Sequence, residues 1–155
     1  MRAECCSTVR PTVRDEAAFV LDSTILAECA RGDTELIGMI QQFDADGVTL
    51  VVPALAVSAA VMGIAERPER SAVVRGICRL ASAEFAGLVT FDDAVELARA
   101  RAYEALLREP WDAHVAEAAL NRRVPILTLD GERWKNAVRD ISGELAVVVV
   151  ADLGE

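Results

Sequence analysis

The sequence has few of the residues and runs on which several common functions depend. It contains one histidine and one lysine among its 155 residues. No apolar run reaches the roughly 18 residues that a membrane span requires, so we expect no association with a membrane. The first 14 residues have no apolar segment typical of a secretory signal, and we therefore expect a cytoplasmic protein.

Motifs for metals, nucleotides and acyl transfer are also missing. The four cysteines form no CxxC pair and have no histidine nearby, which argues against a zinc site. No predicted strand is followed by GxGxxG, GxxxxGK[ST] or GxSxG. The sequence therefore gives no support to a dinucleotide-binding fold, a P-loop or a hydrolase with a serine elbow.

Positive charge is scarce as well. There are 16 Lys and Arg residues against 25 Asp and Glu residues, which gives a formal net charge of -9. A protein that coats nucleic acid by bulk charge needs a positive surface, so this class is excluded. A local basic patch remains compatible with the composition.

Short apolar runs alternate with amphipathic segments along the chain. The runs predict five strands, at residues 18–21, 48–52, 87–91, 124–129 and 145–150. Because parallel strands are joined by helices, this alternation predicts an α/β protein, a three-layer α/β/α fold with a central, mainly parallel five-stranded sheet. Residues 1–16 show no periodicity and are expected to be an irregular extension of a domain that covers residues 17–155.

Aspartates lie where the predicted strands end. Asp22 closes the first strand, Asp130 closes the fourth, and Asp112 opens the helix that leads into the fourth. Each of them alone is explained by helix capping. Three carboxylates gathered at one sheet edge would repel one another unless a cation offset their charge, and their hard oxygens suit Mg²⁺ or Mn²⁺.

Four segments together resemble a PIN domain, the fold of VapC-type toxin ribonucleases: residues 19–24, 52–55, 111–120 and 125–130. The resemblance implies a metal-dependent endoribonuclease with RNA as its substrate and Mg²⁺ or Mn²⁺ as its cofactor. Asp22, Asp112 and Asp130 would then be the catalytic and metal-binding residues, and Ser23 an auxiliary polar residue. The family also suggests a homodimer and, for a toxin, an antitoxin-like partner protein.

One acid of the family's site is missing from this sequence. Counting from Pro53 and from Gly63 places it at Ala59, and Glu66 lies two helical turns further along. Two interpretations follow: a nuclease of weakened activity, or a catalytically inactive PIN-like protein that binds nucleic acid or regulates. Four basic residues flank the predicted cleft and could contact RNA or pair with neighbouring acids: Arg122, Arg123, Arg133 and Lys135.

The helix expected at residues 54–65 is a candidate surface for a homodimer. Its small residues allow another helix to approach closely, and Val57, Val61 and Met62 exceed what one core needs to bury. An exposed apolar face of this kind would support a two-fold homodimer. Complete burial of the helix within one subunit is the alternative.

Overall fold

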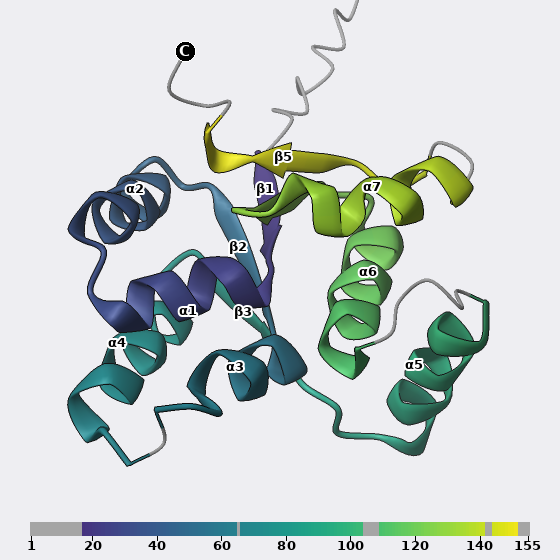
Figure 1. The fold of residues 1–155 in the computed structure, drawn as a ribbon, viewed down its shortest axis with the longest axis horizontal. Helices are drawn as coiled ribbons and strands as arrows, with labels where there is room; N and C mark the ends of the chain where they lie inside the picture. The colour runs from purple at the N-terminus through teal and green to yellow at the C-terminus, as the bar shows by residue number, and fades with distance from the viewer. Residues whose placement is uncertain (1–16, 65, 104–108, 142–143, 152–155) are drawn as a thin grey trace, which may run out of the picture.

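The computed structural model describes residues 17–64, 66–103, 109–141 and 144–151. These residues form a five-stranded sheet in which every pairing is parallel, which confirms the predicted α/β fold. The strand order is β3-β2-β1-β4-β5 (Figure 1). The strands are β1 (Ala18–Leu21), β2 (Thr49–Pro53), β3 (Ala83–Ala86), β4 (Ile126–Thr128) and β5 (Val147–Val149). The extension expected at residues 1–16 lies outside the described residues.

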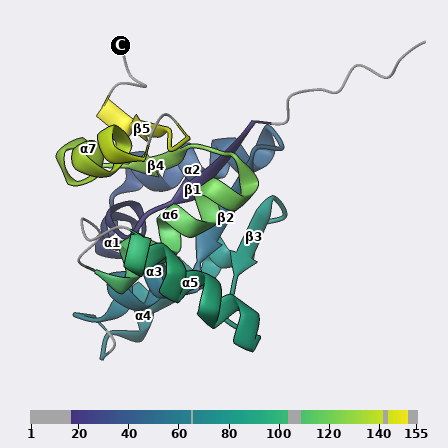
Figure 2. The same cartoon turned by 90° about the vertical axis from the view of Figure 1, so that its right-hand side faces the viewer.

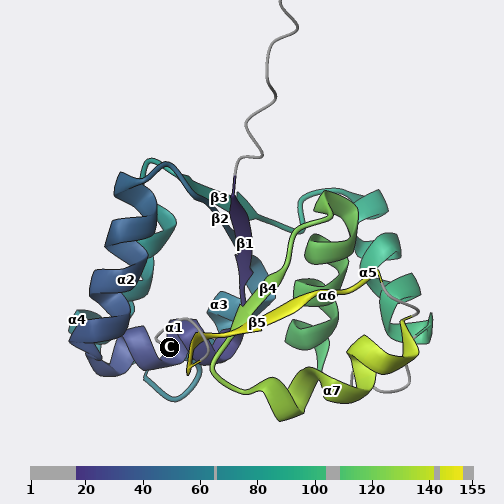
Figure 3. The same cartoon turned by 90° about the horizontal axis from the view of Figure 1, so that it is seen from above.

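Helices cover both faces of the sheet. On one side of β1 lie α1 (Ser23–Arg31), α2 (Thr34–Ala45) and α4 (Pro68–Cys78) (Figure 3). On the other side lie α5 (Phe91–Tyr103), α6 (Pro110–Arg122) and α7 (Gly131–Asp140), with α5 packed against α6 (Figure 2). The remaining helix, α3 (Ala54–Val61), begins directly after β2 and contacts α1 and α6. None of the helices in the described ranges is long and apolar enough to cross a bilayer.

The three central strands form the core because they are covered on both faces. Val20 and Leu21 of β1, Val52 of β2, and Ile126 and Leu127 of β4 are all completely buried. Strands buried on both faces read as unbroken apolar runs, which is why their sequences located them.

The third strand was predicted at the wrong place. It occupies Ala83–Ala86 instead of residues 87–91, because β2 pairs with it in the register Leu50↔Ala83 and ends opposite Ala86. The Ser82 amide donates to Asp44 Oδ1 at 2.7 Å, and this contact fixes where the strand begins. Residues 87–90 have no strand to pair with and form a loop, in which Val89 is exposed.

The strand order changes direction between β1 and β4. The connections from β1 lead outward to β2 and β3, and the chain then returns to place β4 on the other side of β1. In open parallel sheets, ligands bind beyond the carboxyl ends of the strands at such a switch point. Asp22 and Asp130 follow β1 and β4 at this end of the sheet.

Candidate functional site

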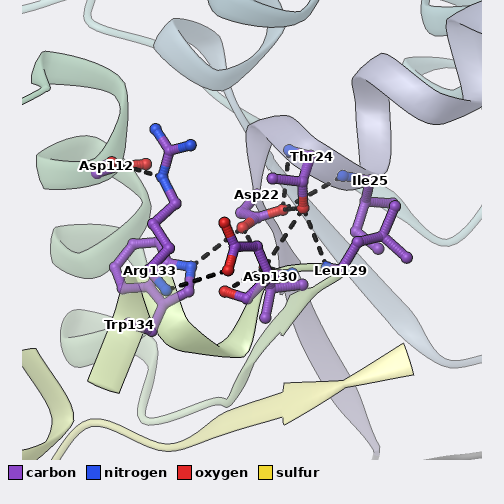
Figure 4. A network of polar contacts seen from close by, with 9 residues as sticks. Asp22, Thr24, Ile25, Asp112, Leu129, Asp130, Arg133 and Trp134 are labelled. Atoms are coloured by element: carbon purple, nitrogen blue, oxygen red, sulfur yellow. Dashed lines mark hydrogen bonds and ion pairs between the residues drawn. The ribbon is translucent and has the colours of Figure 1, made fainter. Parts of the chain in front are cut away.

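Asp22 is completely buried, and its side chain connects three elements of the fold. Its Oδ1 caps α1 by accepting hydrogen bonds from the Thr24 and Ile25 amides, at 3.0 and 3.2 Å. Its Oδ2 accepts from the Thr128 hydroxyl of β4 at 2.6 Å and from Trp134 Nε1 of α7 at 3.0 Å (Figure 4). Both carboxylate oxygens therefore already accept hydrogen bonds from the protein itself.

Asp130 caps α7 at the same end of the sheet. Its Oδ1 accepts from the Arg133 amide at 3.2 Å, and its own amide donates to the Thr128 hydroxyl at 3.0 Å. Asp130 is exposed, whereas Asp22 is buried. The side chain of Asp130 thus stabilises a helix start, as an N-cap acid does.

Asp112 lies in the first turn of α6, which begins at Pro110 and not at Asp112 as predicted. Its side chain is 8% exposed. Oδ2 accepts a hydrogen bond from Arg133 Nε at 2.8 Å, while the buried Oδ1 has no partner among the described residues. Burial raises the pKa of this carboxyl above its usual value, and the hydrogen bond and positive charge of Arg133 partly oppose that increase.

Arg133 joins the acids from α7. Its amide is held by Asp130, its Nε is held by Asp112, and its side chain remains 30% exposed. The two terminal guanidinium nitrogens donate no hydrogen bond to any residue that the structure describes, and Figure 4 shows them directed away from Asp112. Asp22, Asp112 and Asp130 are therefore linked through two neighbouring residues of α7, Arg133 and Trp134.

A cavity of about 520 Å³ opens beside this network. Its polar lining comes from Ser23, Thr24, Glu28, Arg31 and Arg133. Its other lining residues are Ala27, Ala59, Trp111 and Leu129. The cavity thus collects the first turn of α1, the start of α6 and the start of α7 at the carboxyl end of the sheet, where a ligand is expected.

Ala59 occupies the cavity wall, whereas Glu66 does not. The resembled family has an acid at this position. In this chain the position presents the methyl group of Ala59 to the cavity. Glu66 is exposed and lies beyond the end of α3 at Val61, so it does not take over that position.

Sequence reasoning missed several residues of the site. Glu28 and Arg31 line the cavity from α1 and pair with each other at 2.9 Å. Their spacing of four and seven residues from Thr24 places all three on one helical face, and this signal could have identified them. The inward hydroxyl of Thr128, two residues before Asp130, was also detectable from the alternation of side chains along a strand.

The four basic candidates have different surroundings. Arg133 lines the cavity. Arg122 pairs with Glu84 of the edge strand β3 at 2.6 Å, and Lys135 pairs with Glu132 at 3.3 Å. Arg123 ends α6 in the left-handed conformation and is exposed. Of these four residues, Arg133 alone lies within reach of a ligand in the cavity.

The donor set fits a divalent cation poorly. Within the described ranges, no group of three or more His, Cys, Asp or Glu side chains could hold one metal ion. Both oxygens of Asp22 accept hydrogen bonds from the protein, Asp112 accepts from Arg133, and position 59 supplies no oxygen. Mg²⁺ and Mn²⁺ need several such oxygens directed at one point.

Comparison with known proteins adds no family to this description. No protein-family model matches the chain. No curated protein is significantly similar to it. The chemistry of the cavity and of its neighbouring acids is therefore the basis on which a function is inferred.

Proposed function

We propose that the chain is a catalytically inactive PIN-like domain that binds nucleic acid or acts as a regulatory module. The observation that carries this proposal is the ion pair between Arg133 Nε and Asp112 Oδ2 at 2.8 Å. The family resemblance expects a metal ion beside this aspartate. A guanidinium held there offsets the same negative charge and uses one of the oxygens that a metal would need.

Two further features support the loss of hydrolysis. Ala59 places a methyl group in the cavity wall where the family has an acid. The Asp22 carboxylate is used entirely within the fold, since it joins α1, β4 and α7 through hydrogen bonds. A carboxylate engaged in this way maintains structure, and it would have to give up those bonds to coordinate an ion.

The charge of the whole protein restricts how nucleic acid is bound. A net charge of -9 repels a polyanion at long range, so attraction must come from donors concentrated at one place. The cavity supplies Arg31 and Arg133 together with the hydroxyl of Ser23. RNA in single-stranded form is the partner that such a small concave site accommodates.

A weakened metal-dependent endoribonuclease is the second candidate. One observation favours it: Asp112 Oδ1 is buried and has no hydrogen-bond partner in the described part of the chain. Unpartnered buried oxygens are uncommon and call for an explanation. Arg133 is partly exposed, so its side chain has room to turn away and leave Asp112 accessible to Mg²⁺ or Mn²⁺.

Cleavage of a labelled single-stranded RNA by purified protein distinguishes the two candidates. The reaction is followed with Mn²⁺ or with EDTA, and Asp112→Asn serves as the control because it keeps the size of the side chain and removes its charge. The first proposal expects the two proteins to give the same background in Mn²⁺. Cleavage that requires Mn²⁺ and disappears in Asp112→Asn would establish the nuclease instead.

A homodimer and an antitoxin-like protein remain the proposed protein partners. The helix α3 gives the dimer mixed support, since Val57 packs against the core whereas Met62, directly after the helix, is 62% exposed. The large apolar side chains that are most exposed lie elsewhere, at Val89 between β3 and α5 and at Phe91, the first residue of α5. Sedimentation of the wild type and of Phe91→Asp tests whether this second surface forms the dimer.

A further inference from the structure

Arg133 lines the cavity, and its contacts with the acids use only its amide and Nε. We infer that Arg133, held in place by Asp112, binds a phosphate group of single-stranded RNA in the cavity without a divalent ion. This inference rests on the proposed nucleic-acid binding and names the group that is recognised. In it, Asp112 is a positioning residue and the arginine contacts the ligand.

Arg133 is fixed at two points before any ligand arrives. The cap made by Asp130 holds its backbone, and Asp112 holds Nε. The terminal nitrogens donate to no described residue, and Arg133 is part of the cavity lining. A planar guanidinium presents donors in a fixed fork that matches two phosphate oxygens, and fixing it beforehand lowers the entropy lost on binding.

The rest of the cavity matches a nucleotide. Ser23 lines the cavity from the first turn of α1, whose leading amides are capped by Asp22. Trp111 supplies an aromatic surface on which a base can stack. The cavity volume of about 520 Å³ lies within the range typical of small-ligand sites.

One acid in the cavity works against an anion, and its charge is already balanced. Glu28 accepts two hydrogen bonds from Arg31, each 2.9 Å long. The pair is close to neutral, so it does not oppose a phosphate held by Arg133 at the other part of the wall. Arg133 is then the lining cation whose terminal nitrogens donate to no described residue.

Fluorescence anisotropy of a short, labelled single-stranded RNA in EDTA tests the inference. Arg133→Gln removes the fork and should weaken binding about tenfold or more, since hydrogen bonds between charged groups are the strongest class. The matched control is Arg139→Gln, which removes the same charge from an exposed arginine of α7 that pairs with Asp140. The control should change the affinity less than about twofold.

Two additions separate recognition from folding. Arg133→Gln leaves Asp112 as a buried charge without its partner, which destabilises a protein. The double variant Asp112→Asn/Arg133→Gln removes both charges, so it should keep a cooperative melting transition and still bind weakly. Competition with adenosine 5′-monophosphate but not with adenosine should show that the phosphate is the group recognised.

The outcomes are distinguishable. If the wild type binds the RNA in EDTA, and both Arg133 variants lose affinity while Arg139→Gln does not, the inference holds. If the wild type binds but Arg133→Gln equals Arg139→Gln, the inference fails while the proposed function stands. If the wild type binds no RNA, both fail. If it binds only with Mn²⁺, the inference fails and the nuclease candidate gains support.

Discussion

At the residue scale, two aspartates of the site have opposite kinds of surroundings. Asp22 accepts hydrogen bonds at both oxygens from donors on three elements. Asp112 is also buried, yet one of its oxygens meets only Arg133 and the other has no partner in the described chain. The first carboxylate is therefore a structural centre, and the charge of the second is offset by one neighbour, Arg133.

Asp22→Asn should destabilise the protein by about 3 kcal/mol. The Thr128 hydroxyl and Trp134 Nε1 both donate to Asp22 Oδ2, and the NH₂ group of asparagine at that place could not accept these bonds. Hydrogen bonds to a charged group contribute about 1.5–3 kcal/mol. The control is Asp33→Asn, at the exposed N-cap of α2, where asparagine caps as well as aspartate. Urea denaturation measures both. Equal losses for the two variants would contradict the central role of Asp22.

Arg133→Gln should raise the pKa of Asp112 further. Burial already raises it, and the guanidinium holds it down, so removing that charge leaves burial unopposed. The folded protein then binds this proton more readily than the unfolded chain, and stability falls as the pH rises through the folded pKa. Carboxyl ¹³C shifts followed by NMR measure this pKa. A lower value in the variant would show that Arg133 does not act on Asp112.

The acids were predictable from the sequence, whereas the arginine's role was not. Asp22 and Asp130 end strands that their apolar runs identify, so their shared edge follows from the parallel topology. The contact from Arg133 to Asp112 joins residues 21 positions apart on two helices. It depends on how α6 and α7 lie against each other, and no local pattern encodes that geometry.

At the element scale, contacts between elements set the boundaries that propensity misplaced. The strand expected at residues 87–91 has the more apolar sequence, yet β3 forms before it because β2 offers partners only from Leu50 to Pro53. Ser82 and Asp44 then fix the start of that pairing. The position of an edge strand depends on its neighbour, and a single run of residues does not contain this information.

The junction of α3 and α6 should make the protein sensitive to mild acid. His114 is buried in α6, and its Nδ1 accepts a hydrogen bond from the Leu55 amide of α3 at 3.3 Å. Burial lowers the pKa of this imidazole below its usual 6.5. At mildly acidic pH the imidazole is therefore protonated in the unfolded chain before it is protonated in the folded protein. The free energy of unfolding falls as the pH drops below about 6.5.

His114→Asn isolates that contribution. The Asn oxygen can still accept from the Leu55 amide, but it does not titrate. Urea denaturation between pH 7.5 and about 5.5 should show a decline in the wild type and a flatter profile in the variant. Parallel profiles would mean that other groups cause the acid sensitivity.

At the scale of the whole molecule, the order of the strands in the sheet determines where the site lies. The sheet order places β1 beside β4, and this brings the caps of α1 and α7 together with the first turn of α6. Regular alternation of strands and helices predicted this sheet. The alternation did not predict that Arg31 and Arg133 would pair with acids at the cavity. The pair between Arg133 and Asp112 depends on how the helices pack.

The number of phosphates contacted in the cavity sets how RNA binding should depend on salt. A site built on Arg133, with Arg31 as its neighbour, contacts one or two phosphates, so the slope of log K against log salt should lie between about -0.7 and -1.4. Arg133→Gln should make the slope shallower by about 0.7, and Arg139→Gln should leave it unchanged. Anisotropy titrations over a series of KCl concentrations measure it. A slope steeper than about -3 would require many phosphate contacts, which points away from the cavity and toward an extended basic surface. The exposed arginines at the two ends of α4, Arg67 and Arg79, would then be the first residues to replace.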